Sequence, residues 1–243
     1  MGNITVQLYD ETPRHRDNFV KLVREGFYDS LLFHRVIKGF MIQGGDPDSR
    51  NAKPGKRLGE GGPGYKIPAE IRDTLYHKRG ALAAARKGDQ MNPKKESSGS
   101  QFYLVQGKVF SEQELRQMNN SKLQQAYNTQ ITRYLRSPEN DSLLKVYQQY
   151  SQSGQQDKAR ELWNSLRNNE QIAAEAEESA SVLTEKQIKL YTTAGGAPHL
   201  DGGYTVFGEV VEGLEVIDRI AEAETDSRNR PKEDVVMKMR ILD

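Results

Sequence analysis

The sequence predicts a mainly β fold that is interrupted by a block of helices. Of 21 glycines and nine prolines, only Gly154 and Pro138 lie between residues 108 and 194. Because these residue types mark turns, we expect long helices in this middle stretch and short strands in the two flanks. Several short strands with two helices favour a closed barrel or a sandwich whose openings the helices cover.

The first flank, residues 1–107, opens with the pattern of a strand and a helix. Ile4, Val6 and Leu8 alternate with polar neighbours, as in a half-buried strand. Thr12-Pro13 then has the pattern of an N-cap followed by proline at the first helical position, and Gly26 is suited to end the helix. Further strands are expected near residues 31–36, 40–43, 80–85 and 101–106.

The second flank, residues 195–243, predicts a strand at 204–207, a short helix at 213–222 and a closing strand. The helix places one group of apolar residues inward, namely Leu214, Ile217, Ile220 and Ala221. The closing strand has its apolar residues on one side, namely Val235, Met237, Met239 and Ile241.

The middle stretch carries helix start signals and apolar residues at three- and four-residue steps. Ser111 with Glu114 has the spacing of a capping box. A second helix is expected from Ser137-Pro138, a third after Gly154 that extends towards Ala173, and a short fourth capped by Thr184 and Gln187. We expect most of the apolar stripes to pack on one another or on the barrel, and the alternative is that one faces a partner.

Composition excludes several classes of function. The chain has 35 basic and 34 acidic residues, a net charge of +1, so nothing directs it to nucleic acid. There are no cysteines, which excludes disulfides and thiol chemistry. No apolar stretch approaches the roughly 20 residues of a membrane span. The strand-first start and the lack of cysteine favour an exported protein, periplasmic or lipid-anchored with its leader removed, over a cytoplasmic one.

Three familiar types of site lack support. Residues 59–64 match G-x-G-x-x-G, but Pro63 interrupts the motif and no helix follows it, so a surface loop is the better interpretation. The four histidines have no helical pairing, so a metal site has no support in the sequence. No cofactor is expected. No G-x-S-x-G motif is present to support a hydrolase.

Three segments combine polar and apolar residues in a way that suggests a site. They are FHRVIKGFMIQGGD at 33–46, SSGSQFYLVQG at 97–107 and PHLDGGYTVFGEV at 198–210. In the first, Arg35 precedes an apolar run and Gln43; in the second, Gln101 and Tyr103 share one face of a strand. Each segment alone could be an ordinary strand and turn, with Arg35 extending its charged head into water.

Together, the three segments resemble the signature blocks of the cyclophilins, which are peptidyl-prolyl cis/trans isomerases. The order of the blocks matches, as do the first strand and helix and the terminal strand. The resemblance covers residues 1–107 and 195–243 and implies a closed antiparallel eight-stranded β-barrel capped by two helices. Residues 108–194 have no counterpart in a minimal cyclophilin and are expected to be a mostly α-helical insertion.

The resemblance also implies a role for each matching residue. Arg35 would be catalytic and would stabilise the twisted amide. Substrate binding would involve a larger set: Phe40, Met41, Gln43, main-chain groups of Ala85 and Arg86, Gln101, Tyr103, His199, Leu200 and Tyr204. Phe207 would support the core, and His34 would fix the strand of Arg35.

Three positions depart from the family pattern. Cyclophilins often have phenylalanine at the position of Tyr103, so the tyrosine hydroxyl of this chain needs a partner. They often have histidine at the position of Tyr204, and the change is seen in bacterial-type members. They often have tryptophan at the position of His199. Because that last position matters for cyclosporin, weak cyclosporin binding is expected. The partners implied are proline-containing peptides and unfolded or folding proteins. The alternative is a proline-peptide-binding or chaperone module in which the helical insertion binds the client.

Overall fold

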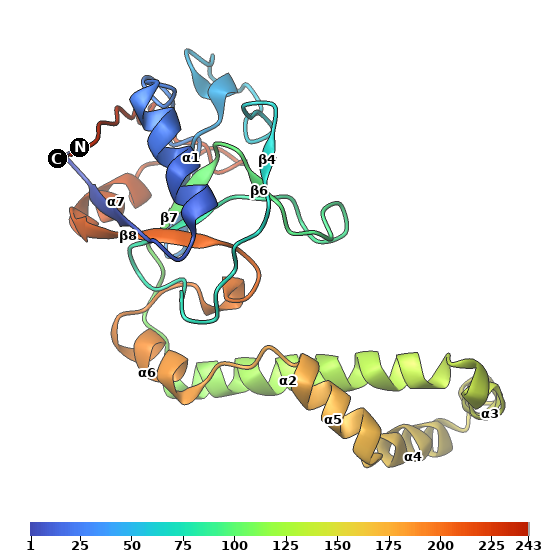
Figure 1. The fold of residues 1–243 in the computed structure, drawn as a ribbon. Helices are drawn as coiled ribbons and strands as arrows, with labels where there is room; N and C mark the ends of the chain where they lie inside the picture. Colours follow the sequence, from blue (N-terminus) through green and yellow to red (C-terminus); the bar gives the residue numbers. More distant parts are fainter. Residues whose placement is uncertain (243) are drawn as a thin grey trace. The chain divides into compact units, whose positions relative to one another are not determined.

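A computed structural model describes residues 1–242, which form two compact units (Figure 1). One unit joins Met1–Phe110 to the segment that starts at Lys189, and the other is Ser111–Ile188. The first boundary, between Phe110 and Ser111, lies three residues after the boundary expected at 107/108. The second, between Ile188 and Lys189, lies six residues before that expected at 194/195. Asp243, the last residue of the expected first domain, lies outside the described residues.

The first unit is built on an antiparallel sheet of six strands. Its strands lie in the order β1-β8-β5-β7-β3-β2. Their bounds are β1 Thr5–Leu8, β2 Arg35–Ile37, β3 Met41–Gly44, β5 Ala81–Ala84, β7 Phe102–Val105 and β8 Val206–Glu212. A second sheet pairs only β4 (Lys66–Ile67) with β6 (Ser97–Ser98).

The expectation of a closed eight-stranded barrel is wrong. Within residues 1–242, the six-stranded sheet ends at β1 on one side and at β2 on the other, and these two strands do not pair. The outer edge of β2 is satisfied by a loop, since the Val36 N–H donates to the carbonyl of Asn229 at 2.8 Å. The expected closing strand is only an isolated bridge between Val236 and Leu32, although Val235 and Met237 are buried as expected.

Two helices pack on the sheet of this unit, α1 (Pro13–Arg24) and α7 (Leu214–Ala221), and both are labelled in Figure 1. Helix α1 contacts β8, and α7 contacts β2 and β3. Short 3-10 turns are found at η1 (Pro47–Ser49) and η3 (Pro198–Leu200). The main core contains an aromatic cluster of Phe19, Tyr28, Phe102 and Phe207, whose neighbouring ring centroids lie 5.1–5.6 Å apart. Phe207 is thus buried in the core.

The second unit is helical. It contains α2 (Glu112–Leu135), η2 (Pro138–Asn140), α3 (Asp141–Gln152), α4 (Gln156–Arg167) and α5 (Glu170–Ser179). The last helix, α6 (Glu185–Thr193), crosses the boundary between the units. A small core forms where α2, α4 and α5 meet, and it contains Ile131, Leu135, Leu166 and Ile172.

The helix signals of the middle stretch have mixed outcomes. The capping box is confirmed, because the Ser111 hydroxyl accepts the Glu114 N–H while the Glu114 carboxylate accepts the Ser111 N–H. The single third helix is wrong, because the chain breaks between α4 and α5. Asn169 accounts for the break, since its side-chain oxygen accepts the N–H groups of Gln171 and Ile172 and so caps a new helix.

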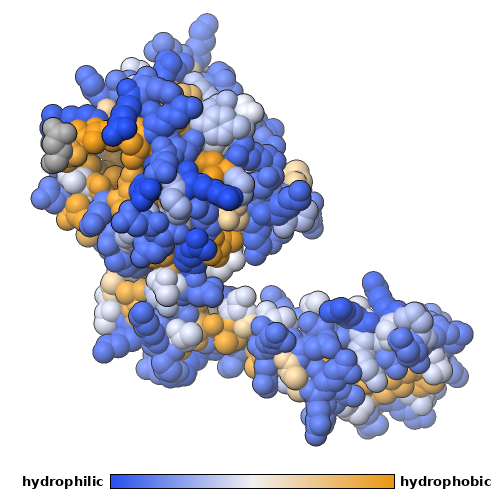
Figure 2. Space-filling view, viewed as in Figure 1, coloured by the Kyte–Doolittle hydropathy of each residue, from blue (hydrophilic) through white to orange (hydrophobic). Residues whose placement is uncertain are grey.

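The surface seen in Figure 2 is mostly hydrophilic, and apolar residues form scattered patches. The described helices include none that combines the length and apolarity needed to cross a membrane. Exposed large apolar residues of the first unit include Met91, Val211 and Val236. Scattered apolar residues of this kind are normal on a folded domain.

The turn after β3 predicts a strongly destabilising substitution. Gly45 has φ +88°, and a Cβ at this position would collide with the carbonyl oxygen of Ser100. We expect Gly45→Ala to lower the free energy of unfolding by about 2–3 kcal/mol or more, from backbone strain together with the collision. Urea unfolding measures the change. Gly88→Ala is the matched control, because open space surrounds Gly88 and its φ is ordinary, and equal losses for both variants would contradict the prediction.

Candidate active site

The register of the sheet places three site residues in a row. Arg35 on β2 lies opposite Gln43 on β3, and Gln43 lies opposite Tyr103 on β7. Directly paired residues of antiparallel strands project to the same face. On β5, the next strand, Ala83 lies opposite Tyr103, so a small side chain continues the row beyond the tyrosine ring.

A chain of amide hydrogen bonds holds Arg35 in place. The Arg35 Nη1 donates to Gln43 Oε1 at 3.1 Å, and Gln43 Nε2 donates to Gln101 Oε1 at 3.0 Å. Gln101 Nε2 in turn donates to the carbonyl of Gly61 at 2.7 Å. Each amide therefore has its oxygen and nitrogen engaged, which fixes their orientation and that of the guanidinium.

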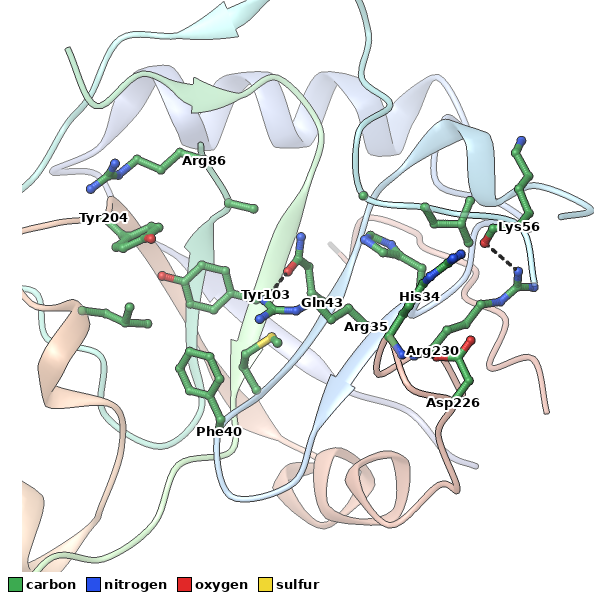
Figure 3. Close-up of a pocket in the computed structure, with 16 residues that line it drawn as sticks. His34, Arg35, Phe40, Gln43, Lys56, Arg86, Tyr103, Tyr204, Asp226 and Arg230 are labelled. Atoms are coloured by element: carbon green, nitrogen blue, oxygen red, sulfur yellow. Dashed lines mark hydrogen bonds between the residues drawn. The ribbon is translucent and has the colours of Figure 1, made fainter. Parts of the chain in front are cut away.

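An apolar pocket lies next to this chain (Figure 3). Met41 and Tyr103 are almost fully buried, and Leu200 on η3 is buried beside them. Phe40 and Tyr204 pack against this cluster as partly buried side chains. In Figure 3 the Tyr103 ring lies between Tyr204 and Phe40, with the Arg35 and Gln43 side chains next to it. The arrangement offers an apolar slot with the Arg35 guanidinium at its side.

The cavity has a volume of about 310 Å³ and contains most of the residues that the sequence implicated. Those that line it are Arg35, Phe40, Met41, Gln43, Ala85, Arg86, Tyr103, Leu200 and Tyr204. Gln101 does not line it and acts on Gln43 instead. His199 does not line it either, and its ring lies 5.1 Å from that of Phe40.

Arg86 contributes more than its main chain. Its guanidinium lies 4.3 Å from the centroid of the Tyr204 ring, and Nε donates to the carbonyl of Gly203 at 2.7 Å. Its Nη1 also donates to the carbonyl of Lys87 at 2.9 Å and forms an ion pair with Asp89 at 2.6 Å. This cation–π contact holds the Tyr204 ring at the edge of the pocket.

The charge of Arg35 is retained although the side chain is half-buried. Burial lowers the pKa of the guanidinium, but an arginine remains protonated at any working pH. Among the described residues it makes no ion pair, and its side-chain bond is to the neutral amide of Gln43. The site therefore presents an uncompensated positive charge to whatever occupies the apolar slot.

The cavity lining also includes residues that the sequence did not implicate. They are Lys56, Leu58, Gly59, Asp226, Arg228 and Arg230. Arg230 is buried and structural, since its guanidinium donates to the carbonyl of Ala52 and forms an ion pair with Asp234, both at about 3 Å. No local pattern in the sequence marks these residues, because loops distant along the chain bring them together.

His77 is a further residue whose role at the pocket the sequence did not reveal. Its Nε2 lies 3.0 Å from the hydroxyl of Tyr103, so the buried tyrosine has the partner that its position requires. The two rings are stacked, with centroids 6.1 Å apart. In the sequence His77 is one of four scattered histidines, and nothing near it pointed to the pocket.

His34, beside Arg35, lines the cavity but does not fix the strand by hydrogen bonds. Neither of its ring nitrogens has a partner of good geometry among the described residues, although the residue is 4% exposed. Burial lowers the pKa of His34 from 6.5 to about 4, and the nearby charge of Asp46 only partly offsets this effect.

The depressed pKa of His34 predicts an acid-sensitive fold. Below pH 6.5 the unfolded chain binds a proton at this residue that the folded chain does not bind until about pH 4, so stability falls as the pH falls through this window. The loss is about 3 kcal/mol, at about 1.4 kcal/mol per pH unit. We expect His34→Gln to flatten this part of the pH profile, measured by urea unfolding between pH 7 and pH 4. Parallel profiles for the two proteins would contradict the assignment.

Known proteins resemble this chain over most of its length. The family model described as cyclophilin type peptidyl-prolyl cis-trans isomerase/CLD matches residues 1–127 and 105–241. A Streptococcus pyogenes serotype M6 protein, assigned as a bifunctional phosphatase/peptidyl-prolyl cis-trans isomerase, is 32% identical over 97% of this chain. A peptidyl-prolyl cis-trans isomerase of Synechococcus elongatus is 46% identical over 42% of this chain. The matched regions span 36% of the Streptococcus protein and 61% of the Synechococcus protein.

Solved structures support the fold. A cyclophilin type peptidyl-prolyl cis-trans isomerase of Cryptosporidium parvum superposes with a TM-score of 0.52 at 20% identity, covering 98% of this chain and 88% of its own. The same protein in the presence of the dipeptide Ala-Pro gives a TM-score of 0.52 at 19% identity. The family model matches both flanks, which contain the three sequence segments that form the pocket. This chain therefore belongs to the cyclophilin-type peptidyl-prolyl cis-trans isomerase family.

Proposed function

We propose that this chain accelerates the cis/trans isomerisation of Xaa-Pro bonds in peptides and in folding proteins, with Arg35 as the catalytic residue. The observation that carries the proposal is the Arg35 guanidinium, held by Gln43 at the side of an apolar slot that suits a proline ring. Family membership supports the reaction, and the residue roles rest on this geometry.

The reaction breaks no covalent bond, so it requires no nucleophile. Its barrier of about 18–20 kcal/mol comes from the amide resonance that is lost as the C–N bond twists. In the twisted state the proline nitrogen becomes pyramidal and its lone pair can accept a hydrogen bond. A guanidinium aimed at that nitrogen binds the twisted state better than the planar state, and this difference lowers the barrier.

Different parts of the pocket would hold the substrate. Phe40, Met41, Tyr103 and Leu200 would surround the pyrrolidine ring, because they form its apolar lining. The side chains of Arg35 and Gln43 would face the peptide groups of the substrate on either side of the proline. Substrate backbone would be bound on the opposite side of the slot, where Ala85 and Arg86 lie.

The main chain at this edge favours Arg86 over Ala85 as the backbone anchor. The Ala85 N–H already donates to the Gln101 carbonyl at 2.9 Å, and the Ala85 carbonyl accepts the Ser98 N–H at 2.8 Å. The hydrogen bonds found among the described residues use neither the N–H nor the carbonyl of Arg86. Arg86 would therefore pair with an extended substrate as an edge strand does, while Ala85 contributes its methyl group to the wall.

We further propose that residues 1–107 and 195–243 act as the isomerase domain and that 108–194 is an inserted helical domain. The separate core of the helical unit, around Ile131 and Leu166, supports this division. The position of His199 beside Phe40 also supports weak cyclosporin binding, since histidine offers less apolar surface there than tryptophan.

Substitution of Arg35 tests the mechanism. We expect Arg35→Ala to lower kcat/KM on a short Xaa-Pro peptide by about 10²–10³-fold, the usual loss when one donor to a developing charge is removed. Arg35→Lys should recover only part of the activity, because lysine keeps the charge without the rigid fork of donors. Exchange between cis and trans peptide signals in NMR spectra measures the rate without a coupling enzyme.

The matched control is Arg24→Ala, since Arg24 is exposed in the last turn of α1. Its activity should equal that of the wild type, and circular dichroism should show both variants folded. Wild-type turnover in folded Arg35→Ala would rule out the catalytic role of this residue.

A further inference from the structure

A buried chain of four side chains runs from the proline pocket to α6. The Tyr103 hydroxyl lies 3.0 Å from His77 Nε2, His77 Nδ1 lies 2.9 Å from Asp201 Oδ1, and the Tyr191 hydroxyl lies 2.7 Å from Asp201 Oδ2. Tyr103, His77 and Tyr191 are each less than 5% exposed. These four side chains thus form a continuous hydrogen-bonded chain through the interior of the first unit.

The chemistry of Asp201 fixes the direction of each bond. Hydrogen bonds from His77 and Tyr191 outweigh burial and lower the pKa of Asp201, so the carboxylate is ionised and only accepts. His77 must then donate through Nδ1, and Tyr191 must donate through its hydroxyl. In the neutral imidazole Nε2 is left as an acceptor, and it accepts a hydrogen bond from the Tyr103 hydroxyl.

The hydrogen-bonded chain joins two walls of the pocket. Tyr103 lies on β7 and forms one wall, while Asp201 directly follows Leu200, the residue of η3 that forms another. The His77 N–H also donates to Asp201 Oδ1 at 2.9 Å, so the η3 turn is bound to the segment that precedes β5. Tyr191 then ties the same carboxylate to α6, the helix by which the chain returns from the helical insertion.

We propose that His77, Asp201 and Tyr191 are positioning residues of the proline pocket, which fix the Tyr103 ring and the η3 turn relative to Arg35. This inference rests on the proposed isomerase function. None of the three lines the cavity, so they act through Tyr103 and Leu200. Because catalysis depends on the position of the proline nitrogen relative to the guanidinium, a loosened wall reduces the rate more than it reduces affinity.

The variant Tyr191→Phe tests the far end of the chain, because it removes one hydroxyl well outside the cavity lining. We expect it to lower kcat/KM by about three- to tenfold, mainly through kcat, since misplacement distant from the chemistry is costly. Asp201→Ala should lower it at least as much, and Asp201→Asn should recover most of the loss, because the amide oxygen still accepts from His77 and the amide N–H can donate to Tyr191.

A double-mutant cycle separates positioning from general stability. If the chain acts on Tyr103, the losses in kcat/KM from Tyr191→Phe and Tyr103→Phe should be coupled, and the double variant should lose clearly less than the product of the two single losses. Tyr28→Phe is the control, since it removes an equally buried hydroxyl, bonded to the Ser100 carbonyl at 3.2 Å, from the other core. Its loss should multiply with that of Tyr103→Phe.

The outcomes are distinct. Thermal unfolding confirms that each variant is folded at the assay temperature. Unchanged kinetics in Tyr191→Phe, or losses that simply multiply in the cycle while the wild type is active, would overturn the positioning role alone. An inactive wild type on every Xaa-Pro peptide would instead overturn the proposed function and this inference with it.

Discussion

The register of β2, β3 and β7 is the constraint on which the site depends. It places Val36, Ile42 and Leu104 in one cross-strand row on the face of the main core. The alternate residues, Arg35, Gln43 and Tyr103, must then project to the opposite face. A slip of one residue would turn the arginine towards the main core and the apolar row away from it, so core packing also determines where the proposed catalytic arginine lies.

The buried polar groups near the site differ in whether they have hydrogen-bond partners. Tyr103 and His77 satisfy each other within a complete chain, so their burial makes the pocket rigid. His34 is buried, and within residues 1–242 neither ring nitrogen has a partner of good geometry, so burial favours the neutral imidazole at the expense of acid stability. The difference shows that proximity to the site does not by itself provide partners.

The sequence predicted most of the elements that position the site, because their signals are local. The strand of Gln43, the helix that begins at Pro13 and the Ser111 capping box are all confirmed, since alternation and capping residues act over a few positions. The closed barrel was wrong, because closure depends on whether the edge of β2 meets a strand or the loop at Asn229. His77 was missed for a related reason: its partners Tyr103 and Asp201 are 26 and 124 residues away along the chain.

An amide partner for Arg35 suits the role proposed for this cation. A carboxylate in the place of Gln43 would orient the guanidinium more strongly, but it would also neutralise the charge at short range. The Gln43 oxygen fixes one side of the fork, and the chain through Gln101 to the Gly61 carbonyl fixes Gln43. Half-burial then reduces the competition from water for the remaining donors. An oriented and unpaired cation beside an apolar slot is thus best suited to a substrate that develops a lone pair as it twists and that carries no formal charge of its own at the reacting atom.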